Sequence, residues 1–114
     1  MKFNVKVPVI DRNKDTVTEP VFVNGVRDTT KQPRTVTLGM LAIRAIDLQL
    51  PEDKDLKPDE VRKRFFLTTR LEAAADSKDG TVDLTPEEVV LIQNRCVHFG
   101  LAVAGQLIVA LDGK

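Results

Sequence analysis

The feature that most constrains the fold of this chain is a change in hydrophobic period near residue 37. Before that point, apolar and polar residues alternate, which is typical of strands buried on one face. The clearest alternating positions are Phe3, Val5, Val7 and Val9. After it, apolar residues recur every three to four positions, which is typical of amphipathic helices. The pattern predicts an α+β fold, with a β-hairpin or small meander in residues 1–36 and three to four helices in residues 37–114.

The length of 114 residues predicts a single domain, 1–114, with one hydrophobic core. Within the first part, Asn24-Gly25 is a strong hairpin-turn dipeptide. Pro8 and Pro20 favour strand ends or edge strands, because proline lacks the N–H that a central strand donates. The sequence leaves open whether the N-terminal strands pair within the chain or between two chains.

Local capping signals predict where the helices begin. Thr37 is an expected N-cap, and the helix that follows it should extend to about Leu48. Pro58 suits a first helical position, and that helix should extend to about Ala75. The strongest signal is Thr85-Pro86-Glu87-Glu88, because the first and last residues of this segment can form a reciprocal capping box.

The C-terminal quarter of the chain is rich in apolar residues. We expect the helix that begins after Thr85 to end at Gly100, with this glycine as the C′ residue. Residues 101–111 are almost uniformly apolar, so their length allows either a buried helix or a buried strand. Their alanines favour a helix.

The helical patterns predict both a core and a surplus of apolar residues. The expected core contains Leu41, Ala45, Ile46, Phe65, Leu71, Val89, Ile92, Cys96, Phe99 and Ile108. The apolar residues that exceed one core-facing stripe are Met40, Ile43, Phe66 and Leu91. Because contiguous exposed apolar surface usually marks an interface, we expect these four residues to bind another protein or a second copy of the chain.

Composition excludes several classes of site. The single cysteine, Cys96, excludes an intramolecular disulfide and a cysteine-rich zinc site, and it fits a reducing compartment. The only histidine, His98, lies two residues further on, so a helix would not bring the two side chains together as a nucleophile and its base. With no glycine-rich phosphate loop and no serine elbow, we expect no cofactor and no enzymatic activity. The longest apolar stretch is shorter than the roughly 20 residues that span a bilayer, and the N-terminus lacks the apolar run of a signal peptide.

The turn in residues 76–88 has some features of a calcium loop. Gly80 can occupy the position of the glycine that such a loop requires. The first and twelfth positions would then be Ala75 and Pro86, which provide no side-chain ligand. We therefore interpret this segment as an ordinary connection between two helices.

Four basic residues lie on the predicted second helix: Arg62, Lys63, Arg64 and Arg70. The first three are consecutive, so they spread around the helix and do not form a stripe. The chain has a formal net charge of zero, which gives no general attraction to nucleic acid. We interpret these residues as a solvated helix face, and the alternative is an accessory protein that binds nucleic acid through them.

Five short segments follow one another along the chain: Thr37-Leu38-Gly39, Arg62-Lys-Arg-Phe-Phe66, Val82-Asp-Leu-Thr-Pro-Glu-Glu-Val89, Val103-Ala104-Gly105-Gln106 and Leu111-Asp112. In content and order they resemble a group of small bacteriophage and prophage proteins, mostly of unassigned function. The resemblance implies a non-enzymatic accessory or assembly protein that binds a phage or host protein, or itself. It also implies a location in the host bacterial cytoplasm or in a virion.

Overall fold

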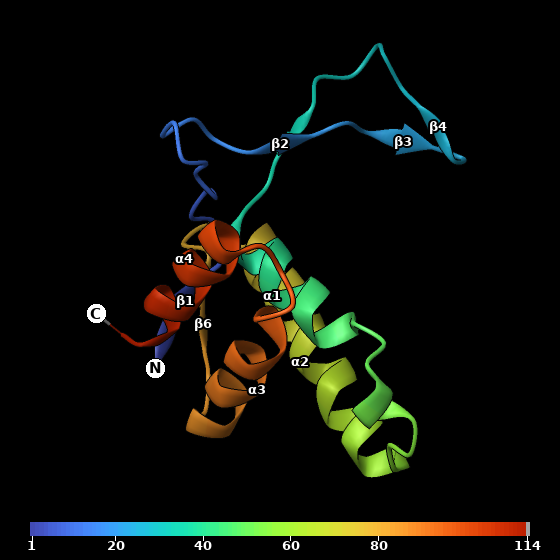
Figure 1. Cartoon of the computed structure of the whole chain (residues 1–114), viewed down its shortest axis with the longest axis vertical. Helices are drawn as coiled ribbons and strands as arrows, with labels where there is room; N and C mark the ends of the chain where they lie inside the picture. Colours follow the sequence, from blue (N-terminus) through green and yellow to red (C-terminus); the bar gives the residue numbers. More distant parts are fainter. Residues whose placement is uncertain (114) are drawn as a thin grey trace.

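The computed structural model describes residues 1–113 and shows a group of packed helices, from which a long β-arm projects (Figure 1). The elements in chain order are β1 (Lys2–Asn4), β2 (Thr18–Glu19), β3 (Phe22–Val23), β4 (Val26–Arg27), β5 (Arg34–Thr35), α1 (Leu38–Asp47), a 3₁₀ turn (Pro51–Asp53), α2 (Pro58–Asp76), β6 (Thr81–Asp83), α3 (Pro86–Cys96) and α4 (Leu101–Leu111). This order confirms the predicted α+β class: five short β elements precede the helices, and a sixth, β6, lies between α2 and α3.

The strands form three separate antiparallel pairs: β1 with β6, β2 with β5, and β3 with β4. The hairpin predicted at Asn24-Gly25 is confirmed, since φ is 53° and 80° at these two residues, as a type I′ turn requires. The first strand does not join this hairpin. It pairs instead with β6, where Phe3 lies opposite Val82, so the start of the chain lies against the connection between α2 and α3.

The predicted helix starts are confirmed. The Thr37 hydroxyl accepts a hydrogen bond from the N–H of Met40 at 3.3 Å. In the capping box, the Thr85 hydroxyl accepts from the N–H of Glu88 at 3.2 Å, and the Glu88 carboxylate accepts from the N–H of Thr85 at 2.9 Å. One predicted helix end is wrong. The third helix ends at Cys96, and Gly100, with φ at −59°, is the N-cap of α4 and not a C′ residue.

Residues 101–111 form a helix, as the alanine content predicted, and this helix completes the core. The buried apolar residues are Phe3, Val5, Val9, Val36, Leu38, Leu41, Ala42, Ala45, Ile46, Leu67, Leu71, Ala74, Leu84, Ile92, Cys96, Ala104, Leu107 and Leu111. Gly39 permits the close approach of the N-terminal segment, because a Cβ there would lie 2.4 Å from the Cβ of Val5. Both parts of the chain therefore contribute to the same core.

Most of the predicted core is confirmed, and one residue is wrong. Phe65 is 64% exposed, although Leu67 and Thr68 on the next turn of α2 are buried. Residues 64, 67, 68 and 71 share one face of α2 at helical spacing. At this turn of the helix, Arg64 and not Phe65 therefore faces the rest of the protein. The Arg64 guanidinium contacts Asp53 at 2.9 Å, so a charged pair occupies the place that Phe65 was predicted to fill. Val89, Phe99 and Ile108 are partly buried and pack against the core.

A nearly buried ion pair joins α3 to the 3₁₀ turn that follows α1. The Arg95 guanidinium, 4% exposed, contacts both carboxylate oxygens of Asp53 at 3.0 and 2.8 Å. It also donates to the carbonyl oxygens of Ala45, at 2.7 Å, and of Leu48. The hydrogen bond from Arg95 holds the pKa of Asp53 far below its usual range. The sequence analysis did not identify this pair, because its two residues lie 42 positions apart and no local pattern links them.

None of the helices formed by residues 1–113 is both long and apolar enough to cross a membrane.

Candidate interaction surfaces

The first candidate surface is the β-arm, residues 18–35, which extends away from the helices (Figure 1). Glu19, at the base of the arm, forms an ion pair with Arg44 of α1 at 2.6 Å, which connects the arm to the helical part. At its tip, Phe22 is 59% exposed and Val26 is 70% exposed. Val23 is 44% exposed, so the hairpin shows apolar side chains on both of its faces.

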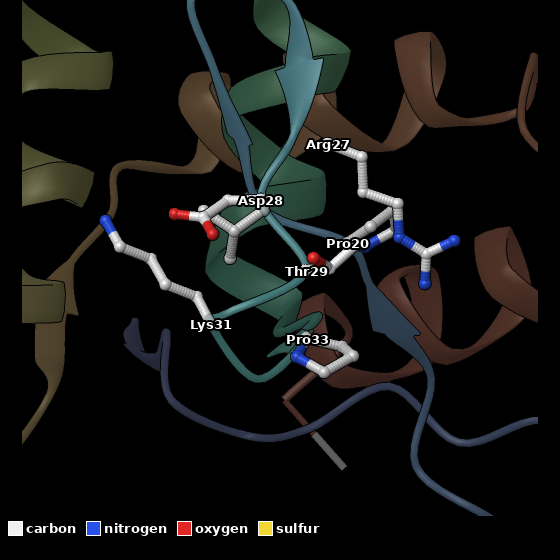
Figure 2. A pocket seen from close by; sticks show the side chains of 7 residues that line it. Pro20, Arg27, Asp28, Thr29, Lys31 and Pro33 are labelled. Atoms are coloured by element: carbon white, nitrogen blue, oxygen red, sulfur yellow. The ribbon is translucent and has the colours of Figure 1, made fainter.

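A small hollow lies at the base of this hairpin (Figure 2). Figure 2 shows Arg27 and Lys31 pointing to opposite sides of it. Its volume is about 150 Å³, whereas small-molecule pockets typically measure about 300–1,000 Å³. Asp28 accepts hydrogen bonds from the hydroxyl and the N–H of Thr30, which lower the pKa of this carboxylate. We interpret the hollow as the inside of a turn that Asp28 stabilises.

The second candidate surface is the α2–α3 groove, with a volume of about 590 Å³. Its lining residues are Glu60, Lys63, Arg64, Phe66, Leu67, Arg70, Thr85, Glu87, Glu88, Val90, Leu91 and Asn94. Phe66 and Val90 are 57% and 51% exposed, so part of the groove lining is accessible apolar surface. Arg70 closes one part of it, since its guanidinium contacts Glu88 at 2.6 Å and donates to the carbonyl oxygen of Asp83. The groove is therefore an apolar strip with charged margins.

The structure brings together two of the four residues predicted to form an interface. Phe66 and Leu91 both line the α2–α3 groove. Met40 and Ile43 lie on α1 and are only partly exposed, and neither lines this groove. Leu91 and Ile43 also pack against the core, so each contributes to stability as well as to the surface.

Two exposed apolar groups were missed by the sequence analysis. One is the hairpin tip, where Phe22 and Val23 are adjacent in the sequence. Neighbouring residues in a strand point to opposite faces, so this apolar pair already indicated that a one-sided hairpin could not bury both. The other is the start of α2, where Val61 is 51% exposed and the ring of Phe65 contacts that of Phe66 edge-on, with centroids 6.0 Å apart.

The four basic residues of α2 do not form a continuous cationic patch. Arg62 contacts Asp59 at 2.6 Å, and Arg64 contacts Asp53 and Glu60 at 2.9 and 3.3 Å. The pairing of Arg70 with Glu88 is described above. Among residues 1–113, Lys63 has no ion-pair partner. Carboxylates therefore neutralise most of the charge that phosphate groups would need.

The remaining side chains considered for chemistry are the single cysteine, the single histidine and the carboxylates of the connection between α2 and α3. Cys96 is fully buried, and this burial raises the pKa of its thiol, while its Sγ lies 3.4 Å from the carbonyl oxygen of Gln93. His98 is exposed and lies in the turn after α3. In the predicted helix connection, Asp79 accepts hydrogen bonds from the N–H and hydroxyl of Thr81, which lower the pKa of its carboxylate. Within residues 1–113, no three or more histidine, cysteine, aspartate or glutamate side chains are grouped so that they could hold a metal ion.

Comparison with known proteins adds no relative. The chain matches no protein-family model, no curated protein and no solved structure at a significant level.

Proposed function

We propose that this chain is a non-enzymatic accessory or assembly protein that acts by binding another protein. The observation that carries the proposal is the size of its surface. A compact monomer of 12.7 kDa exposes about 6,200 Å², whereas this chain exposes 7856 Å². The excess of roughly 1,600 Å² is about twice the roughly 800 Å² that one partner buries in a standard protein–protein interface.

The shape of the chain agrees with this reading. Its radius of gyration is 14.7 Å, against about 13 Å for a compact domain of the same length. Much of the added extent lies in the β-arm, whose tip contains two residue pairs of ladder and three exposed apolar side chains. An isolated two-stranded hairpin is marginally stable in water. A partner that covers the tip would therefore stabilise the hairpin and remove apolar area from water.

The resemblance to small phage and prophage proteins supports the biological side of the proposal. It favours a partner that is a phage or host protein or the chain itself, and a place of action in the bacterial cytoplasm or in a virion. The scarcity of aromatic residues, with five Phe and no Trp or Tyr, offers little for base stacking. This composition and the ion pairs of α2 favour protein binding over nucleic-acid binding.

Site-specific photo-crosslinking in cells tests the proposal. A crosslinker placed at Phe22 or at Phe66 should give one discrete protein adduct, of the chain itself or of a partner. The matched control is Glu72, which is exposed on α2 but lies outside the groove. If the two test positions give no more adduct than Glu72, the proposal is wrong.

A gel-shift titration at low salt examines the alternative of a nucleic-acid-binding protein. Binding that weakens steeply with salt and disappears when Arg62, Lys63, Arg64 and Arg70 are neutralised would replace our proposal. We expect no shift beyond that of a neutral control protein.

A further inference from the structure

The β-arm presents a specific pair of side chains at its tip. In the β3–β4 ladder, Phe22 lies directly opposite Arg27, so the two side chains share one face of the hairpin. Phe22 is 59% exposed, and Arg27 has no ion-pair partner among residues 1–113. This face therefore offers an uncovered aromatic ring beside a free guanidinium.

The α2–α3 groove has residues that complement Phe22 and Arg27 of the arm. Its lining includes Phe66, Val90 and Leu91, which provide apolar surface for a ring, and aromatic pairs add to the energy of such contacts. Its margin contains Glu87, which is exposed and forms no ion pair with any residue from 1 to 113. A free carboxylate on the groove thus corresponds to the free guanidinium on the arm.

The arm and the groove do not meet within one chain. β3 and β4 pair only with each other, and Figure 1 shows α1 lying between the arm and α3. The complementary surfaces are therefore available to a neighbouring molecule. An excess of roughly 1,600 Å² on each of two copies gives about 3,200 Å² in total, which lies within the range of 2,000–5,000 Å² for obligate homodimers.

We propose that the α2–α3 groove binds the β-arm of a second copy of this chain. The Phe22 ring of one copy packs against Phe66 and Leu91 of the other, and Arg27 pairs with Glu87. This inference rests on the proposed function, since it names the chain itself as the protein partner. If each of two copies inserts its arm into the groove of the other, the result is a closed twofold dimer. If each copy inserts its arm into the groove of the next copy, the result is a ring or a filament.

Light scattering coupled to size-exclusion chromatography, over a wide range of protein concentrations, measures the association. The wild-type chain should have a mass of two or more copies. Phe22→Ser and Phe66→Ser should each raise the dissociation constant at least about tenfold, because buried aromatic anchors dominate interface energies. The matched control is Leu101→Ser, which alters a residue 80% exposed at the start of α4 and outside both surfaces. This control should associate like the wild type.

Charge exchange tests the pairing itself. Arg27→Glu and Glu87→Arg should each weaken association, and the double variant should recover most of the lost affinity. Circular dichroism of each variant shows whether the fold is retained, which matters for Glu87 because it lies in the first turn of α3. Recovery in the double variant cannot arise from two independent folding defects, so the result is informative even where a single variant is less stable.

Two results would overturn the inference. One is a wild-type chain that remains monomeric at every concentration. The other is an oligomer that Phe66→Ser leaves intact, and if Phe22→Ser disrupts that oligomer, two arms pair with each other. Neither result would contradict the proposed function, which is tested separately by the crosslinkers at positions 22 and 66 and by the gel-shift titration.

Discussion

Replacing Asp53 with alanine removes the carboxylate that neutralises the nearly buried Arg95 and that also pairs with Arg64. The carboxylate is 10% exposed and the guanidinium 4% exposed, so water cannot take the place of the missing partner. Loss of one member of a buried ion pair costs about 3–5 kcal/mol of unfolding free energy. The carbonyl oxygens of Ala45 and Leu48 would still accept from Arg95, so we expect the lower end of that range, about 3 kcal/mol.

Urea unfolding followed by circular dichroism measures this effect at pH 7. With a denaturant slope of about 2 kcal/mol per M, a loss of about 3 kcal/mol lowers the midpoint by about 1.5 M. The control is Glu19→Gln, which removes a carboxylate paired with Arg34 and Arg44 on the surface. Pairs of this exposed kind contribute about 0–1 kcal/mol. If Asp53→Ala cost no more than Glu19→Gln, our interpretation of Asp53 as a main link between α3 and the 3₁₀ turn after α1 would be wrong.

The same pair predicts a pH dependence. Arg95 lowers the pKa of Asp53 in the folded chain below the value of about 3.9 in the unfolded chain. The resulting stability is fully present above the unfolded pKa and is lost as the pH falls toward the folded pKa. The difference in unfolding free energy between wild type and Asp53→Ala should therefore be largest near pH 7 and should narrow below about pH 4. A difference that stayed constant down to pH 2 would contradict this linkage.

Three further predictions concern stability and reactivity. Thr85→Ala should lower the unfolding free energy by about 1 kcal/mol, measured in urea, because it removes one half of the capping box. Gly39→Ala should lower the melting temperature, because its Cβ would lie 2.4 Å from that of Val5, whereas Gly105→Ala, which meets nothing within 4 Å, should stabilise α4 by up to about 1 kcal/mol. Equal effects at the two glycines would contradict this. Cys96 should react with a thiol reagent only at the rate of unfolding, since it is fully buried and its pKa is raised. Rapid reaction under native conditions would show an accessible thiol.

The interaction surfaces show how far sequence reasoning extended. The surplus of apolar residues on α2 and α3 pointed to Phe66 as a residue outside the core, and Phe66 is 57% exposed. The same reasoning could not separate Phe66 from Met40 and Ile43, because a surplus on a helix does not say which neighbouring element covers it. Sequence reasoning also missed the exposed tip of the arm. An apolar hairpin has the same local sequence pattern whether it packs on the core or projects into solvent.

The elements themselves were determined by short-range chemistry. Capping hydroxyls, a proline at a first helical position and the Asn-Gly turn act within a few residues, so the sequence alone predicted the starts of α1, α2 and α3 and the β3–β4 hairpin. Only the tertiary structure decided which elements meet. The pairing of β1 with β6, the burial of Arg95 on Asp53 and the exposure of Phe65 each depend on contacts between distant segments. Such contacts are selected by the packing of the whole core, and no local pattern records them.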